Sequence, residues 1–316
     1  REFARATLAA GPDEAAVADR HARWFANVAA GAAEGLMGAD QANWVQRLVQ
    51  DEANLLAALA RLLDIDPSSG QAMAADLGRF WESTGRWGLG ARWLRRALEV
   101  PTEAPETRAA LHYWSGRPAL CGGDVELARQ HQEQSLAYWL SCKNFALAAA
   151  CEDGLGELDR IAGRLDEAAR HYQTAHDLAS DAGSSRARAV AQLNLGGLAV
   201  MRGESREGAN LLQEACAVFA DLDDLRSMTR ATANLGYALV MLGDFESARE
   251  KLEWALTQTR SLGDLDGEAG VLANLAIVFN RLGFGRLAAG LLGDALRIQR
   301  QLGRQAEVAK LLLTLD

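Results

Sequence analysis

Apolar side chains recur every three or four positions through the first 66 residues, which is the spacing of one face of an α-helix. Two helices are predicted there. Asp13 opens the first, whose face carries Val17, His21, Trp24, Phe25 and Val28. Asp40 caps the second, whose face carries Trp44, Leu48, Leu55, Leu56, Leu59 and Leu62. The run Pro67-Ser68-Ser69 then predicts a loop, so residues 1–66 form a helical collar ahead of a second domain at 67–316.

Small residues dominate the pattern after the collar, and they repeat. Glycines recur at intervals of 38, 40, 40, 40 and 40 residues, at Gly85, Gly123, Gly163, Gly203, Gly243 and Gly283. Each is followed by Gly or Ala five residues later and by Ala or Ser twelve residues later. Another small residue stands seven positions before it, at Gly78, Gly116, Gly156, Gly196, Gly236 and Ala276. Two helices approach closely only where no side chain intervenes, so each unit is predicted to be a helix pair joined at the turn glycine.

This pattern resembles the tetratricopeptide (TPR) family, with Leu-Gly in the first helix, Gly at the turn, and Ala, a large apolar residue and Ala in the second. Leu235, Gly236, Gly243, Ala248, Leu252 and Ala255 match it in full. The period is 40 rather than 34 residues, which is similar to the long-repeat TPR proteins that bind peptides and protein partners. The resemblance implies an all-α fold, a right-handed TPR superhelix. Its units are expected near 71–103, 108–143, 148–183, 188–223, 228–263 and 268–303, with a terminal helix at 304–316.

The collar has a resemblance of its own. The segments Arg20–Phe25, Gly38–Trp44 and Asp51–Leu59 look like the linker between ATPase and TPR array in bacterial LuxR-type and SARP-type regulators of the STAND class. Those regulators combine a DNA-binding domain, an NB-ARC-like ATPase, a winged helix and a helical sensor. The resemblance implies that this chain is a fragment, with Arg1–Ala4 at the end of an upstream winged-helix region.

Composition narrows the classes of function. A net charge of −9 without a basic stripe argues against nucleic-acid binding, which needs clustered positive charge. Cys121, Cys142, Cys151 and Cys216 lack metal-ligand spacing and are expected to be buried free thiols in a reducing compartment. No apolar run reaches the length of a membrane span, and no signal peptide is recognised. The expectation is a cytoplasmic protein without membrane contact.

Catalysis and metal binding find no support in the sequence. No phosphate-binding loop of the G-x-x-x-x-G-K-[ST] type is present, and the glycines at 85, 88 and 90 follow no strand. His171 and His176 are five residues apart and so lie on different faces of a helix, while His112 and His131 stand alone. Asp223, Asp224 and Asp264 are expected to cap helices. We therefore expect neither an enzyme nor a bound cofactor.

The TPR resemblance places the first helix of each unit along a concave groove. In the last three units this assigns to the groove Leu193, Val200, Met201, Tyr237, Val240, Met241, Ile277, Asn280 and Arg281. In the first three it assigns Arg79, Glu82, Tyr113, Arg117, Asp153, Glu157 and Arg160. The groove is thus charged at one end and apolar at the other. The alternative is that neighbouring helices bury some of these residues.

Asn194, Asn234 and Asn274 stand directly before the Leu-Gly or Leu-Ala of their units. In long-repeat TPR proteins an asparagine ladder at this position grips the backbone of an extended peptide, since an amide both donates and accepts. The alternative is that these amides bond within the helix pair. The favoured hypothesis is a sensor that binds a peptide or protein segment, for which the regulator's own ATPase module is one candidate. The alternative is a stand-alone TPR adaptor.

Overall fold

The computed structural model describes residues 14–101 and 104–302, and every regular element in these ranges is an α-helix. Contacts divide the chain into two compact units, Arg1–Tyr138 and Trp139–Asp316. The expected terminal helix at 304–316, Asp13 and the opening residues Arg1–Ala4 lie outside the described ranges. The prediction of a domain boundary near residue 66 remains a prediction.

The helices of the first unit vary in length, and only the last two have the 17-residue length of most helices in the regular pairs that follow. In chain order the helices are α2 (Glu14–Gly35), α3 (Gln41–Gln50), α4 (Glu52–Ile65), α5 (Pro67–Asp76), α6 (Gly78–Ser83), α7 (Trp87–Glu99), α8 (Pro105–Cys121) and α9 (Val125–Ser141), whose last turn passes the boundary. One continuous core runs from Ala22 in α2 to Leu111 in α8. The collar and the first repeat are therefore packed around the same buried side chains.

Three expectations for this unit are corrected. The second collar helix is two helices, because the chain turns at Asp51 between α3 and α4. The expected loop at Pro67-Ser68-Ser69 is the first turn of α5, where Asp66 accepts a hydrogen bond from the Ser69 amide and proline needs no donor. In α2 the buried positions include Ala22 and Phe25, whereas His21 and Trp24 are exposed.

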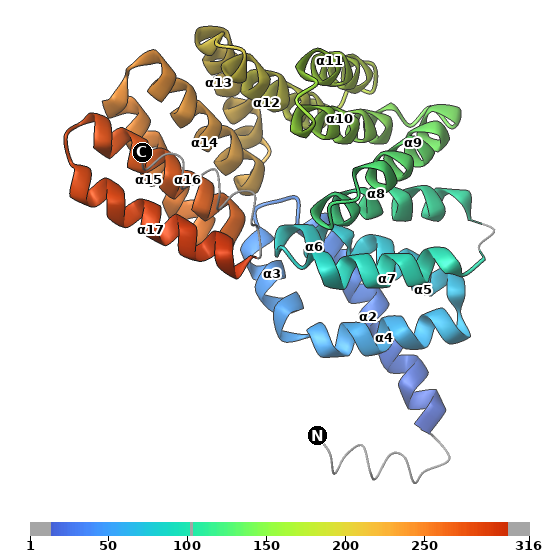
Figure 1. The fold of residues 1–316 in the computed structure, drawn as a ribbon. Helices are drawn as coiled ribbons and strands as arrows, with labels where there is room; N and C mark the ends of the chain where they lie inside the picture. Colours follow the sequence, from blue (N-terminus) through green and yellow to red (C-terminus); the bar gives the residue numbers. More distant parts are fainter. Residues whose placement is uncertain (1–13, 102–103, 303–316) are drawn as a thin grey trace. The chain divides into compact units, whose positions relative to one another are not determined.

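The second unit is a regular array of antiparallel pairs (Figure 1). Repeat three is α10 (Phe145–Ile161) with α11 (Leu165–Asp181), and repeat four is α12 (Ser185–Met201) with α13 (Ser205–Asp221). Repeat five is α14 (Leu225–Leu242) with α15 (Phe245–Ser261), and repeat six is α16 (Leu265–Arg281) with α17 (Gly285–Gln301). The all-α, TPR-like prediction is confirmed.

Left-handed residues end the helices throughout the array. All six predicted turn glycines have positive φ, from 66° at Gly85 to 88° at Gly283. The connections between repeats use the same conformation, at Gly183 and Gly263 but also at Lys143 and Asp223, with φ of 57° and 52°. Asp223 therefore forms the turn and is not a cap as expected. The sequence pattern does not reveal these two turns because they carry no glycine to mark them.

The acidic caps hold consecutive repeats together. Asp224 and Asp264, predicted to cap α14 and α16, accept hydrogen bonds from the amides of Ser227 and Gly267. Each also pairs with an arginine at the start of the preceding first helix, Arg186 with Asp224 and Arg226 with Asp264. The same two side chains thus start one helix and join it to the previous repeat.

The small residues lie where the helices meet, as predicted. Ala248 and Ala255 are fully buried, and so are their equivalents Ala168 and Ala175 in repeat three. A Cβ atom built on Gly236 would lie 2.6 Å from Leu252 Cγ, and one on Gly156 would lie 2.5 Å from Tyr172 Cε1. Two corrections concern the cysteines: Cys121 and Cys142 are exposed rather than buried, because they follow the last buried turns of α8 and α9.

Gly236→Ala is expected to destabilise the chain. The new methyl group must displace Leu252, and overpacking costs about 1–3 kcal/mol, more than the roughly 0.5–1 kcal/mol that alanine adds in a helix. Gly290 in α17 has no atom within 4 Å of such a methyl group, so Gly290→Ala should stabilise. Urea denaturation of both variants checks this. Equal changes in the free energy of unfolding of the two variants would contradict the close approach of the helices at Gly236.

Candidate functional site

The first helices of repeats three to six form one face of the second unit. Helices α10, α12, α14 and α16 contact one another in sequence, whereas consecutive second helices come less close. The array therefore curves toward its first helices, and residues 40 positions apart lie next to one another along this first-helix face. The first-helix face consists of the exposed and half-buried side chains of α10, α12, α14 and α16.

The predicted groove residues divide between this face and the core. Met201, Met241 and Arg281 are exposed on it, and Tyr237 and Ile277 are half-buried. The prediction that Leu193 faces the groove is wrong. Only 2% of its side chain is exposed, because it packs with Phe219 and Leu235 in the core of repeats four and five. Val200 and Val240 are buried in the same way. The alternative of burial by neighbouring helices thus holds for these three residues.

The three asparagines are half-buried on the first-helix face. Asn194 donates from Nδ2 to Asp153 Oδ1 of the preceding repeat at 2.9 Å. Asn234 lies beside Gly197 of the preceding repeat, where a built Cβ would be 3.6 Å from its Nδ2. Neither Asn234 nor Asn274 makes a side-chain hydrogen bond to any residue that the structure describes. Asn194 is thus engaged between repeats, while the other two amides remain open to a ligand.

Asp153 on α10 is a buried carboxyl group that forms no ion pair with a described residue. The pKa of Asp153 is raised to about 7, mainly by burial. The hydrogen bond from Asn194 and the positive charge of Arg230 oppose this rise, and the negative charge of Glu152 adds to it. Arg230 comes from α14, two repeats later, and forms no ion pair with Asp153 within the usual 4 Å. The sequence placed Asp153 toward the groove but gave no sign of its burial.

A second polar group adjoins Asp153. Glu157 binds Arg160 through both oxygens, at 2.7 and 2.8 Å, and accepts a longer hydrogen bond of 3.4 Å from the Tyr172 hydroxyl. Arg160 also reaches Met201 Sδ of the next repeat at 3.9 Å. Arg160, a predicted site residue, is therefore neutralised by Glu157 and held against the next repeat.

An exposed apolar row follows the ends of the first helices. Ile161, Met201 and Met241 occupy equivalent positions 40 residues apart, and about half of each side chain is exposed, at 50%, 49% and 53%. Arg281 takes the same position in repeat six. Methionine adapts its shape to different contacts, so this row suits apolar side chains of a bound segment.

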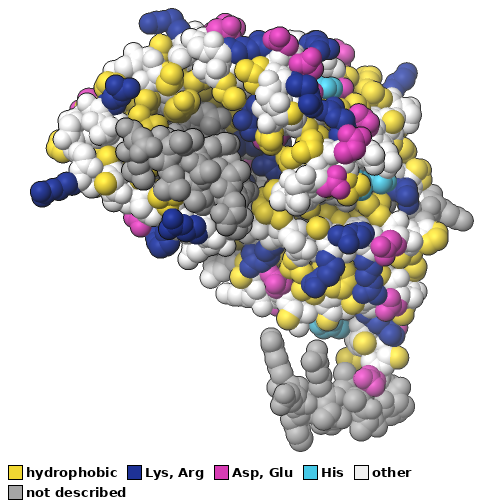
Figure 2. All heavy atoms as spheres, viewed as in Figure 1, with side chains coloured by type: hydrophobic (Ala, Val, Ile, Leu, Met, Phe, Trp, Pro, Cys, Tyr) yellow, Lys and Arg dark blue, Asp and Glu magenta, His cyan; other side chains and the backbone are white. Residues whose placement is uncertain are grey.

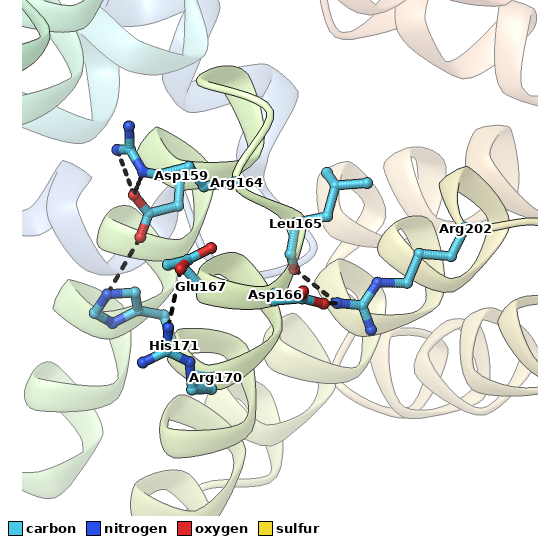
Figure 3. A network of polar contacts seen from close by, with 8 residues as sticks. All are labelled: Asp159, Arg164, Leu165, Asp166, Glu167, Arg170, His171 and Arg202. Carbon is cyan, nitrogen blue, oxygen red and sulfur yellow. Dashed lines mark hydrogen bonds and ion pairs between the residues drawn. The ribbon is translucent and has the colours of Figure 1, made fainter.

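His171 is part of a structural network in repeat three rather than a metal site. Its Nδ1 lies 2.6 Å from Glu152 Oε2, and its Nε2 lies 3.4 Å from Asp159 Oδ2. Figure 3 shows Asp159 also bound by Arg164, and Arg202 of repeat four bound to Asp166 and the Leu165 carbonyl. These bonds join α10 to α11 and repeat three to repeat four. Among the described residues no group of three potential ligands can hold a metal ion.

The first unit holds the remaining predicted site residue, Arg117. Its guanidinium carbon lies 5.8 Å from the centre of the Trp87 ring, and Arg79 lies 5.6 Å over Trp114 in the same way. His112 and His131, expected to stand alone, face each other with 2.8 Å between their Nδ1 atoms. Burial, the neighbouring His131 and Arg108 lower the pKa of His112 to about 4, so the pair is neutral at pH 7.

The surface carries no broad area of one charge on the face seen in Figure 2, where Lys and Arg alternate with Asp and Glu. Within the described ranges, no helix is both long enough and apolar enough to cross a membrane.

No family model matches the chain, and no curated protein matches it significantly. Among solved structures, a Rap protein complexed with Competence and Sporulation Factor is 16% identical over 96% of both chains, with a TM-score of 0.60. The STAND protein PH0952 from Pyrococcus horikoshii, which has a tetratricopeptide repeat sensor, is 12% identical with a TM-score of 0.57, over 97% of this chain and 52% of that one. The apo form of RapI is 11% identical with a TM-score of 0.52, over 74% and 99%. At such identities these similarities show a TPR-like repeat fold.

Asp153→Asn is expected to stabilise the chain at pH 8 by more than about 1 kcal/mol. The pKa of an unfolded aspartate is near 4, so between about pH 4 and pH 7 the folded chain holds the Asp153 proton while the unfolded chain has lost it. The free energy of unfolding of the wild-type chain therefore falls as pH rises through this range. The gain should therefore shrink at pH 4. Denaturant unfolding at both pH values measures it, with the exposed Asp181→Asn as control. A gain independent of pH would contradict the buried state of Asp153.

Proposed function

We propose that the chain is a sensor or scaffold domain that binds an extended peptide-like segment along the first-helix face of repeats three to six. The observation that carries the proposal is the pair of half-buried amides at Asn234 and Asn274, which make no hydrogen bond to the described residues although each has donors and an acceptor. Unused polar groups next to exposed methionines can hold a peptide backbone while apolar side chains cover the surface between them.

The comparisons support this class of function. One similar structure is a Rap protein complexed with Competence and Sporulation Factor, and another is a STAND protein with a tetratricopeptide repeat sensor. By analogy, we propose that this chain belongs to a LuxR-type or SARP-type STAND regulator, whose ATPase and DNA-binding parts are separate domains of the parent protein. A segment of that ATPase module is one candidate for the bound partner.

Regulation would then follow from differential affinity. A ligand that binds the open arrangement of the regulator better than its autoinhibited arrangement shifts the population toward the open one. A stand-alone adaptor would bind the same segment without such a shift. A phosphate-binding loop encoded upstream in the same gene distinguishes the regulator from the adaptor.

The amides are tested by the double variant Asn234→Ala with Asn274→Ala. Peptides selected by phage display against the wild-type chain serve as probes, and calorimetry gives their affinity. Each hydrogen bond lost in a half-buried site costs roughly 1–3 kcal/mol, so the double variant should bind more than about tenfold more weakly. Asn210→Ala with Gln213→Ala, exposed on α13, is the matched control. Unchanged affinity with intact helical content would place the binding surface elsewhere.

A second variant tests the surface without touching the amides. Gly270 on α16 takes the position of Arg230 in the previous repeat, and no atom lies within 4 Å of a Cβ built there. Gly270→Leu should block the selected peptides without destabilising the helix, because leucine favours helix more than glycine does. Gly290→Leu on α17 is equally unhindered and should leave binding unchanged. Equal affinity in both variants would contradict binding at this face.

A further inference from the structure

We propose that the segment bound at the first-helix face is acidic, and that one of its carboxylates pairs with Arg230. This inference rests on the proposed function, since it names the chemistry of the ligand at that same face. It is carried by the charge of the two middle first helices, α12 and α14, and by the exposed guanidinium of Arg230.

Positive charge is concentrated on the middle first helices. Helices α12 and α14 contain four arginines and no acidic residue, although the chain as a whole has a net charge of −9. The second helices α13 and α15 carry residues of both signs, among them Glu214 and Glu253 but also Arg206 and Arg249. A peptide that crosses α12 and α14 therefore meets arginines and no carboxylate on these two helices, whereas α10 and α16 on either side of them carry acidic residues as well.

Two of the four arginines are already used. Arg186 and Arg226 pair with the capping aspartates Asp224 and Asp264. Arg188 and Arg230 are exposed and form no ion pair with any described residue, and the same is true of Arg281 on α16. On α10, Glu157 is bound to Arg160, Glu152 to His171, and Asp153 accepts a hydrogen bond from Asn194.

Arg230 is the best placed of these free arginines. Its positive charge lowers the pKa of both Asp153 and Tyr172 in repeat three, so Arg230 acts electrostatically on the polar groups of α10 and α11. Asn194 lies between the two repeats, and Asn234 lies one helical turn after Arg230 on the same helix. A ligand carboxylate at Arg230 would thus lie beside the amides that hold its backbone, with the half-buried Tyr237 of the same helix to contact adjacent side chains.

Asp153 adds a dependence on pH. The groups that face its carboxyl are Glu152 on α10, Tyr172 on α11, Asn194 on α12 and Arg230 on α14. Since the pKa of Asp153 is about 7, its protonated form is substantially populated at neutral pH and does not compete for Arg230. A ligand carboxylate favours that protonated form, so binding takes up a proton and tightens as pH falls from 8 to 6.

The experiment uses three pools of synthetic fluorescent peptides that share randomised neutral and apolar positions. Two fixed positions carry Glu in one pool, Gln in the second and Lys in the third. Fluorescence anisotropy with the whole chain should show the Glu pool binding at least about tenfold more tightly than the Gln pool, and the Lys pool most weakly. Arg230→Gln should abolish this preference, whereas Arg206→Gln, exposed on the second helix α13, changes the net charge equally and should preserve it.

The pH dependence is measured on the same probes. The Glu pool should bind more tightly at pH 6 than at pH 8, and Asp153→Asn should remove most of that difference. A preference for the Lys pool, or a Glu preference that survives Arg230→Gln, overturns the inference. If the pools bind without regard to charge and the Asn234→Ala, Asn274→Ala variant still weakens them, the inference fails while the proposed function stands. If no pool binds, both fail.

Discussion

The structure of the array depends on how closely the two helices of each pair approach. At Gly116, Gly156, Gly196 and Gly236 the first helix has no side chain, and the space is filled by the residue sixteen positions later, which is Gln132, Tyr172, Leu212 or Leu252. A Cβ atom on any of these glycines would lie less than 3 Å from that partner. This steric condition sets the distance and rotation within these four pairs, and its recurrence every 40 residues makes them alike.

Regular pairs then make a continuous surface from separate helices. Because each repeat is rotated and displaced in nearly the same way, residues 40 positions apart become neighbours. Asn194, Asn234 and Asn274 form one such row, and Ile161, Met201 and Met241 form another. A ligand that follows the array meets the same chemistry at each step, and substitutions at one position vary that chemistry without changing the fold.

Most of the repeat architecture could be predicted because its causes are local. The turn glycines, the small contact residues and the helix caps at Asp224 and Asp264 act within one helix pair, so their spacing is visible in the sequence, whereas the ion pairs of the two aspartates with the preceding repeat are not. The helix ends at Asp51 and Leu77 could not be predicted, since the surrounding apolar pattern continues through both positions. The same holds for contacts between distant residues, such as His112 with His131 and Arg230 with Asp153. Leu193 was misplaced because helical spacing alone does not separate a core position from the half-buried position beside it.

The carboxyl group of Asp153 is not needed for the stacking of the repeats. The equivalent position holds Leu193 in repeat four, Ala233 in repeat five and Ala273 in repeat six, so stacking is satisfied by an apolar side chain there. A buried carboxyl with a pKa raised to about 7 destabilises the chain at neutral pH and contributes nothing to the packing that an apolar residue would not. In the structure this carboxyl accepts the hydrogen bond of Asn194 from the next repeat, and under our proposal it also takes up a proton when a ligand carboxylate binds at Arg230.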